Sequence, residues 1–366
     1  MPYPLLKKLL FTLHPELAHD VVKHSSKLTP KWLLKSFTQK EHKCLHAKIG
    51  KTKIKNPMGL AAGFDKNGEM IDFLDALGFG YLELGSITAL PCHGKPKPRI
   101  FRVLKDQSLI NRMGLPNIGT DAFHEKFKKK KTSCPYGVNI AKTPGFVPSD
   151  LTSVEDYLYS YDALNKLGSY CVLNLSCPNT DDGEMFEEPA LFKELAQEVA
   201  RRRKQKNITK PLLIKVSPDL ETRKLRTTIE LALKYSFDGF VVSNTTMNRT
   251  ALTMSKKDIK QIGAGGLSGL ALTELANKQL KTVHKITEGK KLLIGVGGIM
   301  NVQDALTKIA HGASLLQIYT GFIYHGPLFI KKLNHGLIQA CKKIDVKNYR
   351  DLVGSKELLN YLKKFR

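Results

Sequence analysis

The chain has 366 residues, 42% of them hydrophobic, which is enough to bury a large core and excludes an intrinsically disordered protein. Its six cysteines are scattered and form no CxxC pair, which argues against a metal site, an iron–sulfur cluster or a disulfide framework. The formal net charge of +25 indicates affinity for anions, whether phosphates, acidic lipid headgroups or nucleic acid, and composition does not choose among them.

The first 40 residues carry leucines at helical spacing with lysines between them. Leu5, Leu9 and Leu13 form one stripe, and Lys7 and Lys8 lie off it. Apolar residues continue the pattern at Leu17, Val21, Leu28, Trp32, Leu33 and Phe37. Residues 1–55 hold twelve lysines and three acidic residues. Such helices either lie on a membrane surface or pack on the main domain, and spacing alone favours packing. No hydrophobic run reaches the roughly 20 residues that span a bilayer.

From about residue 57 the chain alternates between apolar, strand-like runs and charged segments of helical length. Eight runs are predicted strands: MGLAAGF, YLELGSIT, YGVNIAK, YCVLNLS, PLLIKVS, GFVVSNTT, KLLIGVGG and SLLQIYTGF. This order predicts an α/β fold, a (β/α)8 TIM barrel over residues 41–366 with a short amphipathic helical extension over residues 1–40. An open, doubly wound sheet is the alternative.

In a barrel of this kind the active site forms where the strands end. The predicted strands end in segments rich in polar residues and glycines, which comprise Ala61, Ala62, Gly63, Phe64, Asp65, Lys66, Gly85, Ser86, Asn139, Asn174, Asn179, Lys215, Ser243, Asn244, Thr245, Gly297, Gly298, Tyr319 and Thr320. Asparagines and lysines at so many strand ends predict a ligand site rather than core.

Two glycine-rich stretches bear on the ligand. IGVGGI after the seventh strand, with Tyr319 and Thr320 after the eighth, offers backbone amides near helix starts, which suits a phosphate. GAGGLSG at 263–269 is superficially similar to a dinucleotide fingerprint, but a polar, lysine-rich segment precedes it instead of a strand. A phosphate-bearing cofactor other than a dinucleotide is therefore predicted. For the basic run KFKKKK at 126–131, the sequence does not decide between a solvated segment and a further role.

Nine motifs together resemble those of the dihydroorotate dehydrogenases. They are NPMGLAAGFDKNG at 56–68, PKPRIFR at 96–102, INRMG at 110–114, GVNIAK at 137–142, NLSCPNT at 174–180, SNTT at 243–246, GGLSG at 265–269, GVGGI at 295–299 and GASLLQIYTGF at 312–322. The N-terminal extension and the second and third motifs are similar to the membrane-associated, quinone-using class 2 branch. The resemblance implies an FMN enzyme that oxidises dihydroorotate to orotate in pyrimidine biosynthesis and passes electrons to a quinone.

The resemblance also assigns residues to roles. FMN would be held by Ala61, Ala62, Gly63, Phe64, Asp65, Ser86, Asn139, Asn174, Lys215, Ser243, Gly269, Gly298, Tyr319 and Thr320. The substrate would be bound by Lys66, Asn111, Arg112, Met113, Gly114, Leu115, Asn174, Asn179, Asn244 and Thr245. His19 and Arg102 would lie near the inner end of a quinone tunnel, and Cys177 would be the general base. Asparagine suits orotate because a carboxamide offers both a donor and an acceptor.

The chain departs from the class 2 pattern in its active-site loops. Cys177 and the TDDGEMF segment after it are similar to the soluble class 1 enzymes, and Leu115-Pro116-Asn117 replaces an aromatic-Asn-Asn sequence. Ser86 and Ser243 stand where threonine is common. A class 1 enzyme that uses fumarate or another acceptor, a related dihydropyrimidine-oxidising flavoenzyme, and a basic non-enzymatic module remain the alternatives. The class 2 interpretation implies a peripheral protein at the cytoplasmic face of the inner membrane, in contact with anionic lipid and not with nucleic acid. A monomer is one option for its oligomeric state.

Overall fold

The fold is built around a closed barrel of eight parallel strands. The computed structural model describes residues 3–30, 34, 41–145, 152–176 and 185–364. The barrel strands are β3 (Met58–Leu60), β4 (Tyr81–Ile87), β7 (Tyr136–Ile140), β8 (Tyr170–Asn174), β9 (Leu212–Val216), β10 (Gly239–Val242), β12 (Leu292–Val296) and β13 (Leu315–Ile318). Each of the eight predicted strands is one of these. The last strand pairs with the first, Leu316 opposite Met58, so the prediction of a barrel is confirmed and the open sheet is wrong.

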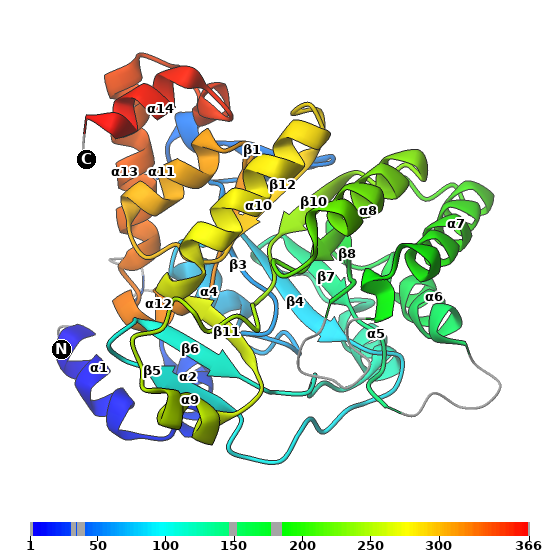
Figure 1. Cartoon of the computed structure of the whole chain (residues 1–366), viewed down its shortest axis with the longest axis horizontal. Coiled ribbons are helices and arrows are strands. Elements are labelled where there is room, and N and C mark those ends of the chain that lie inside the picture. Colours follow the sequence, from blue (N-terminus) through cyan, green and yellow to red (C-terminus); the bar gives the residue numbers. More distant parts are fainter. Residues whose placement is uncertain (1–2, 31–33, 35–40, 146–151, 177–184, 365–366) are drawn as a thin grey trace.

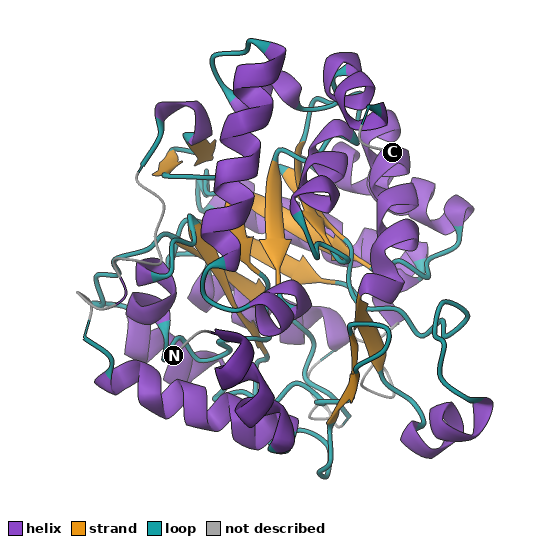
Figure 2. Cartoon of the chain, turned by 90° about the vertical axis from the view of Figure 1, so that its left-hand side faces the viewer, coloured by secondary structure: helices purple, strands orange, loops and turns teal. Residues whose placement is uncertain are grey.

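Helices surround the barrel, as Figures 1 and 2 show. They are α4 (Ile71–Ala76), α5 (Thr120–Phe127), α6 (Ser153–Leu164), α7 (Pro189–Gln205), α8 (Thr222–Lys234), α10 (Thr273–Ile286), α11 (Val302–Ala310), α12 (Thr320–His325), α13 (Phe329–Ile344) and α14 (Lys356–Lys363). Local signals fix several boundaries: α6 begins with a capping box between Thr152 and Glu155, and α11 begins with one between Asn301 and Asp304. Their apolar faces meet strands that are buried along their whole length, such as β4 and β8.

Two antiparallel sheets lie outside the barrel, and the sequence pattern did not reveal them. β1 (Ala47–Ile49) and β2 (Thr52–Ile54) form a hairpin. β5 (Ile100–Val103), β6 (Ser108–Asn111) and β11 (Gly266–Gly269) form a three-stranded sheet, with α9 (Lys256–Ile262) just before β11. The glycine-rich segment GGLSG therefore belongs mostly to β11, which pairs with β6 and so connects the segment after β10 to the segment after β4. This place in an outer sheet agrees with discounting it as a dinucleotide fingerprint.

The N-terminal helices α1 (Tyr3–Thr12) and α2 (Pro15–Leu28) are fastened to this outer sheet. The Arg99 guanidinium donates to Glu16 Oε1 at 2.8 Å from Nε and 2.6 Å from Nη2, and the Arg99 backbone amide donates to Glu16 Oε2 at 3.3 Å. Arg102 donates to the carbonyls that end α1, at 2.7 Å to Leu13 and 3.2 Å to Leu10. Both arginines lie on or beside β5, so this strand positions the two helices.

The helices do not bury all of their apolar residues against the barrel, although spacing alone favoured packing. Leu9 is 58% exposed, Leu17 52% and Leu28 84%. The other side of the pair faces inward, where Leu6, Leu10 and Val22 line a cavity. Among the residues that the structure describes, no helix is both long enough and apolar enough to cross a membrane.

Candidate active site

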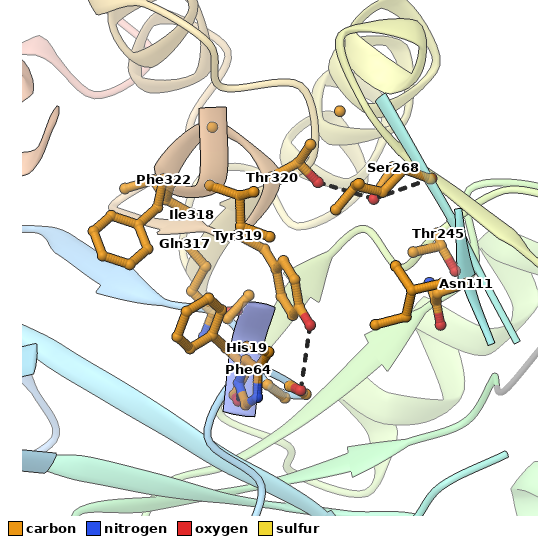
Figure 3. Close-up of a pocket in the computed structure, with 18 of the residues that line it drawn as sticks. His19, Phe64, Asn111, Thr245, Ser268, Gln317, Ile318, Tyr319, Thr320 and Phe322 are labelled. Carbon is orange, nitrogen blue, oxygen red and sulfur yellow. Dashed lines mark hydrogen bonds between the residues drawn. The ribbon is translucent and has the colours of Figure 1, made fainter. Parts of the chain in front are cut away.

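One cavity of about 350 Å³ runs from the N-terminal helices to the ends of the barrel strands. Figure 3 shows part of its wall, with His19 at one side and Asn111 and Thr245 at another. The predicted site residues that line it are His19, Ala61, Ala62, Gly63, Phe64, Lys66, Ser86, Arg102, Asn111, Met113, Leu115, Asn174, Lys215, Ser243, Asn244, Thr245, Gly269, Gly298, Tyr319 and Thr320. Residues that lie far apart in the sequence therefore meet around one space. Most of them follow barrel strands that end at the same rim, and the others belong to α2 or lie in or beside the outer sheet of β5, β6 and β11.

Hydroxyl groups and glycines meet at one end of this cavity. Ser268 Oγ lies 2.9 Å from Thr320 Oγ1, and Ser268 also donates to the Leu109 carbonyl at 3.4 Å (Figure 3). Gly269 and Gly298 have φ of +99° and +73°, a conformation that glycine adopts without strain. A Cβ on Gly298 would lie 2.2 Å from Thr273 Oγ1, so only glycine fits there. Sequence reasoning missed Ser268, although its hydroxyl inside GGLSG was an available signal.

A chain of hydrogen bonds links the barrel interior to the polar part of the cavity. It starts at Glu83, which is fully buried in β4 and accepts from Asn139 Nδ2 at 2.7 Å. Ser86 Oγ donates to Asn139 Oδ1 and accepts from Asn174 Nδ2 at 3.3 Å. Asn174 Oδ1 accepts from Asn244 Nδ2 at 3.2 Å. Because the Asn139 amide donates to a carboxylate, its carbonyl is left to accept from Ser86, and each later group is oriented in turn.

Gln317 on β13 belongs to the same network and also lines the cavity. Its Nε2 donates to Glu83 Oε2 at 2.6 Å, and Tyr170 OH donates to the same oxygen at 3.2 Å. Gln317 is 1% exposed, and its Oε1 has no hydrogen-bond partner among the described residues. A buried acceptor of this kind normally meets a donor, so Gln317 marks a polar contact for a bound molecule. Glu83 and Gln317 were not predicted, since their strands read as continuous apolar core.

Two lysines supply positive charge to the cavity. Lys215 is 6% exposed and lies opposite Asn174 in the pairing of β9 with β8. Lys66 Nζ donates to the Gly63 carbonyl at 2.8 Å. Burial, with a smaller contribution from the Arg99 charge, lowers the pKa of Lys66 to about 8. Lys66 is therefore mostly protonated at neutral pH, and it loses its charge as the pH rises through about 8.

The end of the cavity beneath the helices is mostly apolar. His19 Nε2 lies 2.9 Å from the Phe64 carbonyl, and its ring meets the Phe64 ring edge to face with centroids 5.3 Å apart. Burial, and then the Lys66 charge, lowers the pKa of His19. Phe64 in turn contacts the rings of Tyr319 and Phe322. Leu6, Phe11, Ala18 and Val22 complete this end, which suits a hydrophobic molecule better than a charged one.

Other predicted residues lie behind the cavity wall or beyond the described residues. Asp65 accepts from the backbone amides of Glu69 and Met70, both at 2.8 Å, and so orders the loop before α4. Arg112 donates to the Pro98 carbonyl and lies over the Phe101 ring, and the Gly114 carbonyl accepts from Cys92 Sγ. Asn139 is fully buried beneath the floor. Cys177 and Asn179 lie outside the residues that the structure describes.

The closed barrel and the cavity at its strand ends define the class of protein, a TIM-barrel enzyme. The family model described as Dihydroorotate dehydrogenase matches residues 44–341, and the chain belongs to this family of flavin-dependent oxidoreductases. The chain is 36% identical to a "Dihydroorotate dehydrogenase (quinone)" of Buchnera aphidicola, over 92% of this chain and 100% of that protein. A protein of the same name from Hamiltonella defensa is 38% identical, over 92% and 99%.

A solved structure agrees. The crystal structure of DHODH from Eimeria tenella in complex with ferulenol matches with a TM-score of 0.81 and 30% sequence identity. The match covers 93% of this chain and 95% of that one. The ligand-free form from the same organism matches with a TM-score of 0.80.

Proposed function

We propose that this protein uses FMN to oxidise dihydroorotate to orotate in pyrimidine biosynthesis, with a membrane quinone as electron acceptor. The observation that carries the proposal is the single cavity that joins a polar pocket at the strand ends to an apolar opening beneath α1 and α2. A hydrophilic substrate and a hydrophobic acceptor need such different surroundings within reach of one cofactor. The curated relatives that bear the name "(quinone)" support the same acceptor.

The residues present fit FMN. The Ser268 and Thr320 hydroxyls, with the backbone of Gly297 and Gly298, would hold its phosphate. The unpartnered oxygen of Gln317 lies ready for a donor group of a bound molecule. When bound, FMN supplies the hydride acceptor and the carrier that connects the two substrates. Ala61, Ala62, Gly63, Ser86, Asn174, Lys215, Ser243 and Tyr319 are the proposed wall around it, with Asn139 supporting Ser86 from below. Phe64, Asp65 and Gly269 complete the proposed set.

The substrate pocket is proposed at the carboxamides of Asn111, Asn174, Asn244 and Asn179 and at Thr245. The Glu83 network holds Asn174 and Asn244 in one orientation before substrate arrives, so binding costs little further ordering. Lys66 would attract the substrate carboxylate, and Met113 and Leu115 would close the pocket. Lys215 would favour negative charge that develops in a site shielded from water. Arg112 and Gly114 belong to the same proposed loop but stand behind its surface.

Cys177 is the proposed general base, which removes a proton from the substrate carbon next to a carbonyl. Its loop starts at Asn174 and Ser176, and Ser176 accepts from Asn244 Nδ2 with both its carbonyl, at 2.6 Å, and its hydroxyl, at 3.1 Å. The loop thus leaves the barrel at the proposed substrate pocket. A thiol with an ordinary pKa of about 8.5 ionises far more readily near neutral pH than a serine hydroxyl.

The N-terminal segment is the proposed quinone and membrane module, residues 1–40, attached to the catalytic barrel, residues 41–366. His19 and the stem of Arg102 would border the quinone, while the Arg102 guanidinium holds the end of α1 in place. The exposed leucines of α1 and α2 would rest on a bilayer at the cytoplasmic face of the inner membrane. We propose peripheral attachment of a monomer, with no role for nucleic acid.

An acceptor screen tests the function. The purified protein in detergent should be yellow and should form orotate from dihydroorotate when a quinone is supplied. Fumarate at the same concentration should support less than about a tenth of that rate. A class 1 enzyme would give the opposite ranking, and a colourless protein that takes up no FMN would contradict the proposal altogether.

A further inference from the structure

The lysine run at 126–131 lies on the surface at the end of α5. Its five lysines, Lys126 and Lys128–Lys131, are all exposed. Phe127, within the run, is 2% exposed and stacks on Phe123 with ring centroids 4.5 Å apart. A buried aromatic residue therefore anchors the segment, and the lysines around it are held at a fixed place on the molecule.

That place is beside the carboxyl-terminal end of α2. Ser26, Lys27 and Thr29 border the same cavity, about 330 Å³, as Lys130 and Lys131. Lys126 Nζ donates to the Asn67 carbonyl at 2.7 Å, in the loop that follows β3. Glu69 in the same loop lies 3.4 Å from Lys23 and 3.7 Å from Lys27. We call Lys23, Lys27, Lys126 and Lys128–Lys131 the lysine cluster.

Acidic residues near the lysine cluster are too few to neutralise it. Glu69 is shared between Lys23 and Lys27, Asp20 lies 3.7 Å from Lys23, and Glu125 pairs with Lys128 at 2.5 Å. Asp72 borders the same cavity as Lys130 and Lys131. These ion pairs are partly or fully exposed, so each contributes little and is screened by salt. A net positive potential therefore remains over this part of the surface.

The lysine cluster also borders an apolar stripe. Leu17, Val21 and Leu28 are 52%, 41% and 84% exposed. They lie on one face of α2, because steps of four and eleven residues are close to whole helical turns. Lys27 lies about 100° round the helix from the middle of that stripe, on its flank, and Lys23 lies further round, both toward Glu69. An exposed apolar stripe with lysines along one side is the arrangement of a surface that meets both the acyl region and the headgroups of a bilayer.

We infer that the lysine cluster is a second membrane contact, which binds acidic phospholipid headgroups while the α2 stripe meets the apolar layer. The inference deepens the membrane attachment proposed above and rests on it. It assigns a membrane contact to the end of α5, in addition to the one proposed for α1 and α2. Two contacts on different elements would fix the tilt of the barrel on the membrane and so keep the apolar opening of the cavity toward the lipid.

The test compares two variants of the full-length protein with equal losses of charge. One is Lys128→Gln/Lys129→Gln/Lys130→Gln/Lys131→Gln. The control is Lys342→Gln/Lys343→Gln/Lys363→Gln/Lys364→Gln, whose lysines are also exposed but lie in and after α13 and α14, at the end of the molecule away from α1 and α2 (Figures 1 and 2). Binding is measured by co-sedimentation with vesicles of a zwitterionic phospholipid, with and without an anionic one.

The cluster variant should bind anionic vesicles at least about tenfold more weakly than the unmodified protein at low salt, and the difference should shrink as salt is added. The control should lose less than about threefold. The double variant Lys129→Gln/Lys130→Gln, which perturbs the surface less, should show an intermediate loss. Equal losses in the cluster variant and the control would mean that only net charge matters. That result, or no loss of binding in either variant, would overturn the inference.

Two further readouts separate this inference from others. If the cluster variant kept its vesicle binding but lost binding to double-stranded DNA, the surface would serve nucleic acid and the inference would be wrong. Orotate formation with a water-soluble quinone should be the same in all variants, because the lysines do not line the active-site cavity among the described residues. Failure of the unmodified protein in that assay would contradict the proposed function, whereas the vesicle comparison would still report on the lysine cluster.

Discussion

At the scale of single residues, burial decides how Lys66 behaves. Burial lowers its pKa to about 8, whereas an exposed lysine titrates near 10.4. Below pH 8 the ammonium group is present and attracts an anionic ligand. As the pH rises through about 8, the unliganded protein loses this charge, so binding an anion must first restore the proton.

Orotate affinity should therefore fall above pH 8, by up to about tenfold for each pH unit. The measurement is the dissociation constant of orotate between pH 6.5 and 9.5, in a Cys177→Ala background so that this thiol does not titrate. The matched control, Lys66→Gln, should bind orotate weakly with little change over the same range. A flat profile in the protein that retains Lys66 would show that another group holds the carboxylate.

A second prediction at this scale concerns Cys177. Removing a general base typically costs about 10²- to 10⁴-fold, so Cys177→Ala should form orotate at least about 10²-fold more slowly while it retains FMN. Cys177→Ser should keep some activity, with its pH profile moved to the alkaline side.

Cys171→Ala is the matched control for Cys177, because Cys171 is a 1% exposed cysteine inside β8. This variant should lower the melting temperature with little change in orotate formation. Near-normal orotate formation by Cys177→Ala would mean that a different group accepts the proton.

At the scale of elements, the connection of α2 to β5 depends on one ion pair. Glu16 and Arg99 have side chains only 8% and 12% exposed, and two short hydrogen bonds join them. Breaking one partner of a buried pair leaves the other charge without compensation, which costs about 3–5 kcal/mol. The lost free energy weakens the docking of α2 and not the barrel, because the barrel does not depend on this ion pair.

Glu16→Gln should therefore loosen α2 without unfolding the barrel. Hydrogen exchange should become faster in Pro15–Leu28, and the KM for a long-chain quinone should rise while orotate binding stays within about twofold. Glu188→Gln is the control, since it breaks an exposed pair with Lys224 that water and salt screen. Unchanged exchange in α2 would show that apolar contacts alone hold the helix.

At the scale of the whole molecule, the proposed division at residue 40 separates the two half-reactions. The strand-end pocket is built by the barrel, whereas the apolar opening is completed by α1 and α2. Loss of the helices should remove the quinone site and the exposed leucines together.

A protein that starts at residue 41 should accordingly lose at least about 10-fold in quinone reduction in detergent. With a water-soluble acceptor it should form orotate at a rate within about threefold of the full-length chain. Its FMN content serves as the control for folding. Full activity with a hydrophobic quinone would contradict the assignment of the helices to that site.

The sequence by itself determined the barrel and the polar residues at the strand ends that line the cavity. Eight apolar runs with amphipathic segments between them fit this architecture, and polar residues at the strand ends necessarily gather at one rim. The strand-end pattern therefore assigns Lys66, Asn174 and Thr320 to one site. Their spacing from the strands carried the information.

Only the tertiary structure decided the contacts that depend on which groups meet across the fold. Glu83 and Gln317 lie in strands that read as apolar core, and their roles appear only where β4 and β13 face each other inside the barrel. Helical spacing did not show that Leu17 and Leu28 face outward, because a stripe has the same period whichever side it faces. The lysine run lies beside α2 only because β3, α5 and α2 converge. The period of an apolar stripe shows which residues share one face of an element. The packing of the whole chain decides what that face meets.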